Sequence, residues 1–137
     1  MSDEASSHDL HQIGAVADRV GLSQRTIRHY DEIHLVTPSG RSPGGFRLYT
    51  DRDVERLVHI KAMKPLGFSL EETGALLEIH DRIRADEALD ADMLETLRTS
   101  VERAQQQCAK LATQLTEARA LTKAIERELE IAERASD

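Results

Sequence analysis

Side chains that can bind a polyanion gather in one short part of this sequence. Residues 23–49 hold four arginines against two acids, a local net charge of +2, whereas the whole chain has 18 basic and 25 acidic residues and a net charge of −7. An arginine guanidinium can form paired hydrogen bonds with phosphate and with base edges. A basic patch on an acidic chain argues against a histone-like coat protein and favours binding at selected sites.

Five of the candidate side chains fall in one predicted helix. Ser23 is a suitable N-cap for a helix over residues 24–32. That helix is expected to bury Ile27 and one face of Tyr30. A shorter helix ends before it at Gly21, so the two form a helix-turn-helix pattern whose second helix would enter the DNA major groove. The candidates on or near its exposed face are Arg25, Thr26, Arg28, His29 and Tyr30.

The remaining basic candidates lie in a predicted hairpin, or wing, after this helix. Residues 37–45 have the Pro, Gly and Ser content of a loop, and residues 46–49 alternate like a short strand. Arg41 and Arg47 flank this wing, where they can contact phosphates of the adjacent DNA backbone. The wing candidates are Arg41, Phe46, Arg47 and Tyr49.

Two further helices are needed to position these elements. Thr50 and Asp53 form a capping box that begins a third helix, which ends at Pro65 and Gly67. A second capping box begins a fourth helix at Ser69. Their buried faces are expected to carry Val54, Leu57, Val58 and Ile60 in the third helix, and Leu70, Leu76, Leu77 and Ile79 in the fourth.

The last third of the chain has a different pattern. Apolar residues follow alternating steps of three and four from Leu94 onward, with Thr122 as the plainly polar exception and without Gly or Pro. Such a helix would be about 58 Å long, and its single apolar stripe needs a partner, most simply a second copy of the chain. The predicted dimerisation residues are Leu94, Leu97, Val101, Ala104, Cys108, Leu111, Leu115, Ala118, Ile125 and Leu129.

These patterns predict a mainly α-helical protein with four regions. We expect a disordered arm at residues 1–9, a DNA-binding domain at 10–80, a linker or hinge at 81–92, and a dimerisation helix at 93–135. No apolar run approaches the length of a membrane span, and the acidic first residues do not resemble a signal peptide. We therefore expect a soluble, cytoplasmic protein without membrane association.

Several motifs occur together in one order and spacing. They are IGAVA at 13–17, GLSQRTIRHYDE at 21–32, GGFRLY at 44–49, DV at 53–54 and LGFSLEE at 66–72. This stretch, residues 10–79, closely resembles the MerR family of transcriptional regulators. The resemblance covers about half of the chain.

The resemblance implies a homodimer in which two winged helix-turn-helix domains are joined by an antiparallel coiled coil. Members of this family bind an over-long promoter spacer, and they bend and untwist it so that RNA polymerase can use the −35 and −10 elements. The expected partners are thus double-stranded promoter DNA, a second copy of the chain and RNA polymerase at the nucleoid. By family analogy Arg28, Arg47 and Tyr49 contact mainly the DNA backbone, and Arg25, Thr26 and His29 make sequence-dependent contacts.

Two residues depart from the family pattern. His34 stands where Gly commonly ends the recognition helix, so this turn must accept a residue that is less at ease at positive φ. Pro65 replaces a helix-forming residue, so the third helix should break early or kink there.

The sequence predicts no metal, no cofactor and no enzymatic activity. The single cysteine, Cys108, falls on the apolar stripe and lacks the closely spaced Cys partners of the family's metal sensors. His80 stands near the position of a metal ligand in such sensors, but its partners are missing. A small-molecule effector stays unidentified, and we expect any pocket for one to lie between the coil and the DNA-binding domains. No catalytic constellation is recognisable.

Two alternatives to an inducible regulator stay open. The protein could be a coiled-coil interaction or scaffold protein whose head binds another protein. Within the DNA-binding class, it could instead be an effector-independent repressor.

Overall fold

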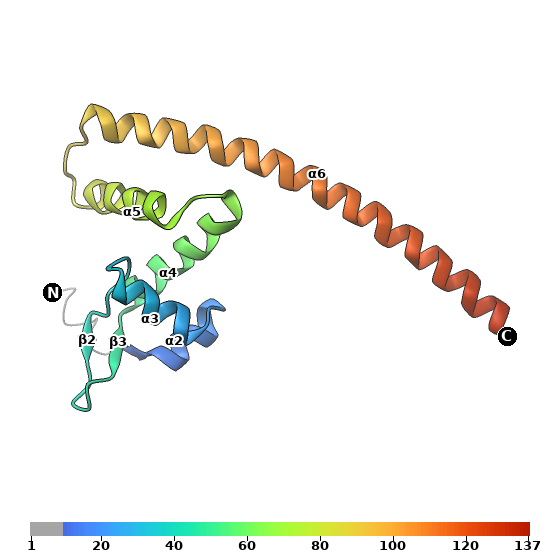
Figure 1. The fold of residues 1–137 in the computed structure, drawn as a ribbon, viewed down its shortest axis with the longest axis horizontal. Helices are drawn as coiled ribbons and strands as arrows, with labels where there is room; N and C mark the ends of the chain where they lie inside the picture. Colours follow the sequence, from blue (N-terminus) through green and yellow to red (C-terminus); the bar gives the residue numbers. More distant parts are fainter. Residues whose placement is uncertain (1–9) are drawn as a thin grey trace. The chain divides into compact units, whose positions relative to one another are not determined.

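A computed structural model describes residues 10–137, and the expected N-terminal arm at 1–9 lies outside them. The chain divides into two compact units at residues 89 and 90. The first unit, called the head, holds helices α2 to α5 and a small sheet, and the second is the single helix α6 (Figure 1). The prediction of a mainly helical protein with a long C-terminal helix is confirmed.

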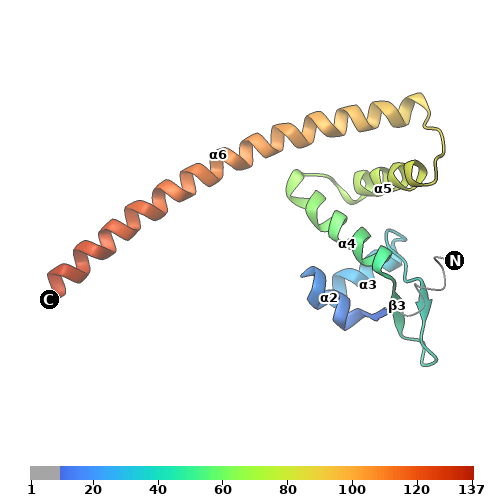
Figure 2. The ribbon, with the colours of Figure 1, turned by 180° about the vertical axis from the view of Figure 1, so that it is seen from behind.

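Helices α2 and α3 form the predicted helix-turn-helix. α2 spans Ile13–Val20 and ends at Gly21, whose φ of 74° lies in the left-handed region that glycine tolerates. α3 spans Gln24–Glu32 and begins at Ser23, whose side chain accepts a hydrogen bond from the Thr26 backbone N–H. Figure 2 shows α2 and α3 side by side next to strand β3 (Arg47–Tyr49).

The wing belongs to a three-stranded antiparallel sheet. Its strands are β1 (His11–Gln12), β2 (Gly40–Arg41) and β3, with β3 in the centre. β2 and β3 form the wing hairpin, with Arg41 opposite Arg47. β1 was not predicted, and it anchors the start of the described chain to β3 by pairing His11 with Tyr49.

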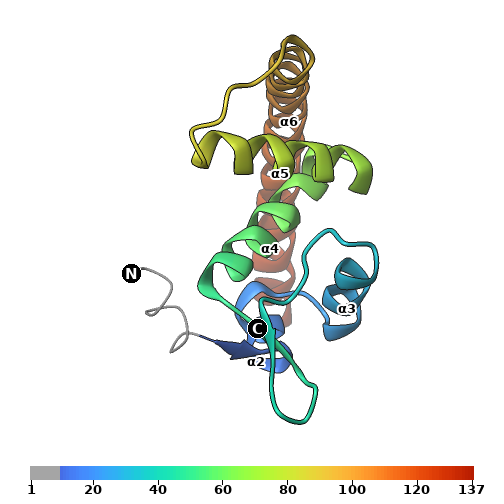
Figure 3. The ribbon, with the colours of Figure 1, turned by 90° about the vertical axis from the view of Figure 1, so that its left-hand side faces the viewer.

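Helices α4 and α5 complete the head. α4 spans Asp51–Met63 and α5 spans Leu70–Arg84, and both begin with the capping boxes that the sequence predicts. The α-helical geometry of α4 ends before Pro65, and a 3₁₀ turn, η1 (Lys64–Leu66), follows. The predicted early break is thus confirmed. Figure 3 shows α5 lying across α4.

The core of the head is built from all of these elements. Its fully buried large side chains are Val16, Ile27, Val36, Tyr49, Leu57 and Leu77. Two side chains predicted to be buried are exposed, Val58 at 50% and Leu70 at 43%, and Leu76 is only partly buried. The buried residues of α4 recur every third position, which turns Val58 away from the core. Leu70 is in the first turn of α5, at the edge of the core.

The turn after α3 has the positive φ that a helix end at this position requires, although His34 stands where the family commonly has Gly. His34 adopts φ 60°, in the left-handed region, although it is not a glycine. The backbone N–H groups of Leu35 and Val36 then donate to the Tyr30 carbonyl at 2.8 and 3.2 Å. The Tyr30 carbonyl near the end of α3 is therefore hydrogen-bonded, and the side chains of Leu35 and Val36 are buried in the core.

Helix α6 spans Ala91–Ser136, and Asp90 caps its first turn by accepting a hydrogen bond of 2.8 Å from the Met93 N–H. Between the two units, α5 continues to Arg84 and a short loop follows at 85–90, so the region expected as a hinge contains the end of one helix and the start of the next. No residue of α6 is buried. The stripe on α6 is therefore not buried within a single chain.

Candidate nucleic-acid interface

Helix α3 presents a basic row on its exposed side. Arg25, Arg28 and His29 are exposed, and their spacing of three and four residues places them on one face. Ile27 and Tyr30 point the other way and are buried at 0% and 6% exposure. The core contact of these two side chains fixes which face of α3 is turned outward.

Hydrogen bonds along α3 position two of the candidates. The Thr26 hydroxyl lies 2.8 Å from the Ser23 hydroxyl, whose oxygen also accepts from the Thr26 N–H at 3.0 Å. Arg28 donates to the Gln24 side-chain carbonyl, one turn earlier, at 3.5 Å. Arg25 has neither a hydrogen bond nor an ion pair to any side chain in the part of the chain that the structure describes. Its charge is thus available to a ligand.

The tip of the wing is a compact turn. The Ser42 N–H donates to the Phe46 carbonyl at 2.9 Å, and the Gly45 N–H donates to the Ser42 carbonyl at 2.8 Å. Gly45 adopts φ 84°, a conformation that residues with a Cβ atom rarely adopt. Phe46 is 69% exposed at the base of this turn, so an apolar ring is presented beside the wing arginines.

Asp31 joins the wing to the recognition helix. Arg47 Nε donates to Asp31 Oδ2 at 2.8 Å, and Arg41 Nη2 lies 3.5 Å from the same oxygen. The hydrogen bond to Asp31 raises the pKa of Arg47 above its ordinary value. Arg41 also donates to the Gly45 carbonyl at 3.3 Å. One carboxylate therefore holds an arginine from each strand of the hairpin against α3.

Two tyrosines assigned to DNA contact are core residues. Tyr30 is 6% exposed and Tyr49 is fully buried, and burial raises the pKa of both phenols. The Tyr49 hydroxyl has no hydrogen-bond partner in residues 10–137. In this conformation both tyrosines belong to the core of the head, so a DNA contact by either phenol stays a prediction that burial makes harder to satisfy.

The sequence analysis did not recognise the organising role of Asp31. It counted this residue only as a negative charge in a basic segment, because the cross-strand pairing of Arg41 with Arg47 depends on a register that the sequence does not reveal. The sequence analysis also missed the contacts of Asp51, which lies 2.7 Å from the His11 imidazole and 3.5 Å from Arg19. The signal for both is a carboxylate near the start or end of a helix, which is common.

Other kinds of site are not built by the described residues. Among residues 10–137, no group of three His, Cys, Asp or Glu side chains is placed to hold a metal ion. Cys108 is exposed on α6. None of the helices in this range is long and apolar enough to cross a membrane.

Comparison with known proteins supports the helix-turn-helix. The profile described as MerR HTH family regulatory protein matches residues 12–78, and the profile described as MerR, DNA binding matches residues 54–118. Together they cover the head and the first half of α6.

Relatives of this chain are transcriptional regulators. An uncharacterized HTH-type transcriptional regulator of Pseudomonas aeruginosa is 40% identical over 94 residues, which are 66% of this chain and 71% of the relative. The mercuric resistance operon regulatory protein of Bacillus cereus is 42% identical over 82 residues, 60% of each chain. The crystal structure of MtaN, the N-terminal part of the Bacillus subtilis multidrug transporter activator, is 32% identical with a TM-score of 0.51, covering 87% of this chain and 97% of MtaN. This chain therefore belongs to the MerR family of helix-turn-helix transcriptional regulators.

Proposed function

We propose that this regulator binds promoter DNA as a homodimer and reads its sequence with the exposed face of α3. The observation that carries this proposal is the row of Arg25, Arg28 and His29, held outward by the buried Ile27 and Tyr30. A helix with such a row fits the major groove, where arginine recognises guanine by paired hydrogen bonds. In this proposal the regulator performs no catalysis and uses no cofactor.

The resemblance to MerR regulators suggests how the contacts divide between α3 and the wing. Arg25, Thr26 and His29 make the sequence-dependent contacts, and Arg28 contacts the backbone. Arg41, Arg47 and Phe46 place the wing on the flanking backbone. Because Arg47 already donates its Nε to Asp31, its remaining N–H groups are the ones available to a phosphate.

The second copy joins through α6. Its apolar side chains are exposed in the single chain, including Val101 at 53%, Leu115 at 49% and Ile125 at 54%. Their spacing over this 46-residue helix matches a coiled-coil seam, and burying the seam removes apolar area from water. The partner helix runs antiparallel, so that each end of the coil carries one DNA-binding domain.

Two heads at a fixed separation can distort the DNA between them. We infer that the dimer bends and untwists an over-long spacer, and thereby presents the −35 and −10 elements to RNA polymerase in the cytoplasm. Deformation of the spacer costs a few kcal/mol, which the phosphate contacts of two heads can offset.

In vitro transcription tests this mechanism. Templates that carry the bound promoter with a normal or a lengthened spacer are transcribed with and without the protein. Activation confined to the lengthened spacer is expected. Repression on both templates contradicts the untwisting mechanism and identifies an effector-independent repressor.

A protein-binding scaffold makes a different prediction. If the head binds protein rather than DNA, a dimer that carries Arg28→Ala keeps its function in cells. Loss of regulation by this variant, with dimerisation retained in sedimentation, removes the scaffold alternative.

A further inference from the structure

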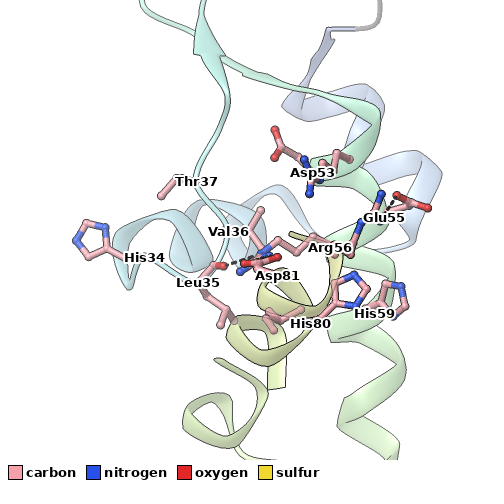
Figure 4. Close-up of a pocket in the computed structure, with 13 residues that line it drawn as sticks. His34, Leu35, Val36, Thr37, Asp53, Glu55, Arg56, His59, His80 and Asp81 are labelled. Atoms are coloured by element: carbon pink, nitrogen blue, oxygen red, sulfur yellow. Dashed lines mark hydrogen bonds and ion pairs between the residues drawn. The ribbon is translucent and has the colours of Figure 1, made fainter. Parts of the chain in front are cut away.

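The head contains a cavity on a side that the basic row does not use. It has a volume of about 370 Å³, and Figure 4 shows it between the turn after α3, helix α4 and helix α5. All the residues that line the cavity belong to the head. The sequence, by contrast, led us to expect any pocket between the coil and the DNA-binding domains.

The walls are two helix faces. Arg52, Glu55, Arg56 and His59 recur at helical spacing along α4, and Leu77, His80, Asp81 and Arg84 do so along α5. The turn adds the apolar side chains of Leu35 and Val36. Leu35, Val36 and Leu77 are at most 9% exposed, so the cavity has an apolar floor under polar walls.

The acids of the cavity are already engaged. Both oxygens of Asp81 accept from Arg56 Nη1, at 2.8 and 3.0 Å. Asp53 Oδ2 accepts from the Ser39 hydroxyl at 2.6 Å and from the Thr50 N–H at 2.9 Å. Asp81 is thus paired with Arg56, and Asp53 belongs to the cap of α4. Neither carboxylate neutralises the other basic groups of the cavity.

Glu55 is the loosest of the three acids. Its Oε2 lies 4.0 Å from Arg84 Nη1, which is beyond hydrogen-bond distance. Both side chains are well exposed, at 66% and 48%, so their pairing is weak and does not close the cavity.

Several basic groups of the cavity have no such partner. The side chains of Arg52 and His34 make no hydrogen bond or ion pair with any residue that the structure describes. His59 and His80 face each other with ring centroids 5.7 Å apart, and the described part of the chain offers neither ring a hydrogen bond (Figure 4). An imidazole presents an N–H donor in either protonation state.

We propose that this cavity binds a small organic anion, a carboxylate or phosphate monoester carried on an apolar body. Arg52, His59 and His80 donate hydrogen bonds to the anionic group, and the body lies on the floor formed by Leu35, Val36 and Leu77. A volume of about 370 Å³ is in the range of small-molecule sites, and donors at the wall over an apolar floor are the usual design of such sites. Charge-assisted hydrogen bonds from arginine favour these two anionic groups.

Other occupants fit the cavity less well. A metal ion needs at least three ligands, and no such group exists among residues 10–137. The residues proposed to contact DNA lie on α3 and the wing, and none of them lines this cavity. The proposed site depends on the structure of the head alone and does not rest on the proposed DNA binding.

Isothermal titration of the full-length protein with three probes tests the proposal. Benzoate carries a carboxylate, phenyl phosphate carries a phosphate monoester, and benzamide is a neutral molecule of similar shape. Saturable binding of at least one anion is expected, with benzamide bound about tenfold or more weakly. The better anion identifies the charged group. Equal binding of benzamide, or saturable binding of neither anion at millimolar concentration, overturns the proposal.

Variants locate the bound probe. Arg52→Gln and His59→Gln should each weaken binding of the better anion about tenfold, with the thermal unfolding midpoint unchanged. Imidazole NMR signals of His59 and His80 should move on titration, and those of His11 and His29 should not. Binding that survives both substitutions, or shifts that spare His59 and His80, would place the anion elsewhere and overturn the site.

Arg25→Gln is the matched control because it removes an arginine of the head outside the cavity. This variant should keep its affinity for the anion and lose affinity for DNA. Loss of anion binding in Arg25→Gln would contradict the assigned site. A protein that binds the anion but no promoter DNA would instead contradict the proposed function and leave this site intact.

Discussion

Asp31 shows how single residues set the geometry of the reading surface. Its carboxylate is 15% exposed and holds Arg47 at 2.8 Å and Arg41 at 3.5 Å, so charges on three elements share one point. Arg47 itself is only 26% exposed. A half-buried pair of this kind is costly to break from one side, because the remaining charge loses its partner.

Asp31→Asn should therefore lower the free energy of unfolding by about 1–3 kcal/mol, measured by urea titration. The neighbouring change Glu32→Gln is the control, because it removes the same charge from an exposed side chain that makes no hydrogen bond or ion pair with the described residues and acts on Arg47 only through its charge at a distance. It should change stability by less than about 0.5 kcal/mol. Equal effects of the two substitutions would show that Asp31 does not hold the wing.

His34 is strained by its backbone conformation. At φ 60° its Cβ lies close to the backbone, which a glycine avoids. We expect His34→Gly to stabilise the head by about 0.5–1 kcal/mol, seen as a higher midpoint of thermal unfolding. His34→Ala should give no such gain, since alanine retains the Cβ. A lower midpoint for His34→Gly would mean that the imidazole makes a contribution larger than the strain.

Asp51 links the stability of the head to pH. The hydrogen bond from His11, followed by the charges of His11 and Arg19, lowers the pKa of Asp51 below its ordinary 3.8. A carboxylate whose pKa is lowered by folding contributes stability above the pKa of the unfolded state, and that stability is lost as pH falls through the folded pKa. NMR titration of the carboxyl carbon should give a midpoint below 3.8 that rises in His11→Gln. A midpoint at or above 3.8 in the unaltered protein would contradict the contact.

At the scale of elements, local signals predicted the helices well. The capping boxes at Thr50 and Ser69, the break before Pro65 and the left-handed turn at His34 all depend on residues within a few positions of one another. Such signals can be read without knowledge of the fold. The end of α2 at Gly21 was predicted from the same kind of local signal.

Features that depend on distant parts of the chain were not predicted. β1 is two residues long and exists only because β3, almost forty positions later, provides its hydrogen-bond partners. The sequence predicted that one face of Tyr30 is buried but not that nearly the whole side chain is. Tyr49 could not be assigned to core or surface, because the sequence of a short strand does not reveal which face is buried. The cavity likewise depends on how α4 crosses α5.

At the scale of the whole molecule, α6 requires a partner. Its exposed apolar side chains include Leu111 at 37% and Leu129 at 58%, along a helix without a buried residue. An uncovered stripe of this length on one helix is typical of an oligomer interface. A second copy would cover it.

Leu111→Lys should abolish dimerisation and, with it, binding to the full promoter site, because a charge on the seam cannot be buried without a partner. Sedimentation velocity measures the first effect and gel shift the second. Gln106→Lys adds the same charge on the outer face of the same helix and should leave the dimer intact. A monomeric Leu111→Lys variant with undiminished affinity for the full site would show that the coil is dispensable.

The most direct test of the central claim measures how α3 discriminates DNA sequences. Fluorescence anisotropy compares binding to a promoter fragment from upstream of the protein's own gene with binding to a scrambled fragment at one salt concentration. The account predicts tighter binding to the promoter, and Arg25→Gln should reduce that preference by about 1–3 kcal/mol. Arg127→Gln, an exposed arginine on α6, should leave it unchanged. Equal affinity for both fragments, or a preference that survives Arg25→Gln in full, would contradict the account.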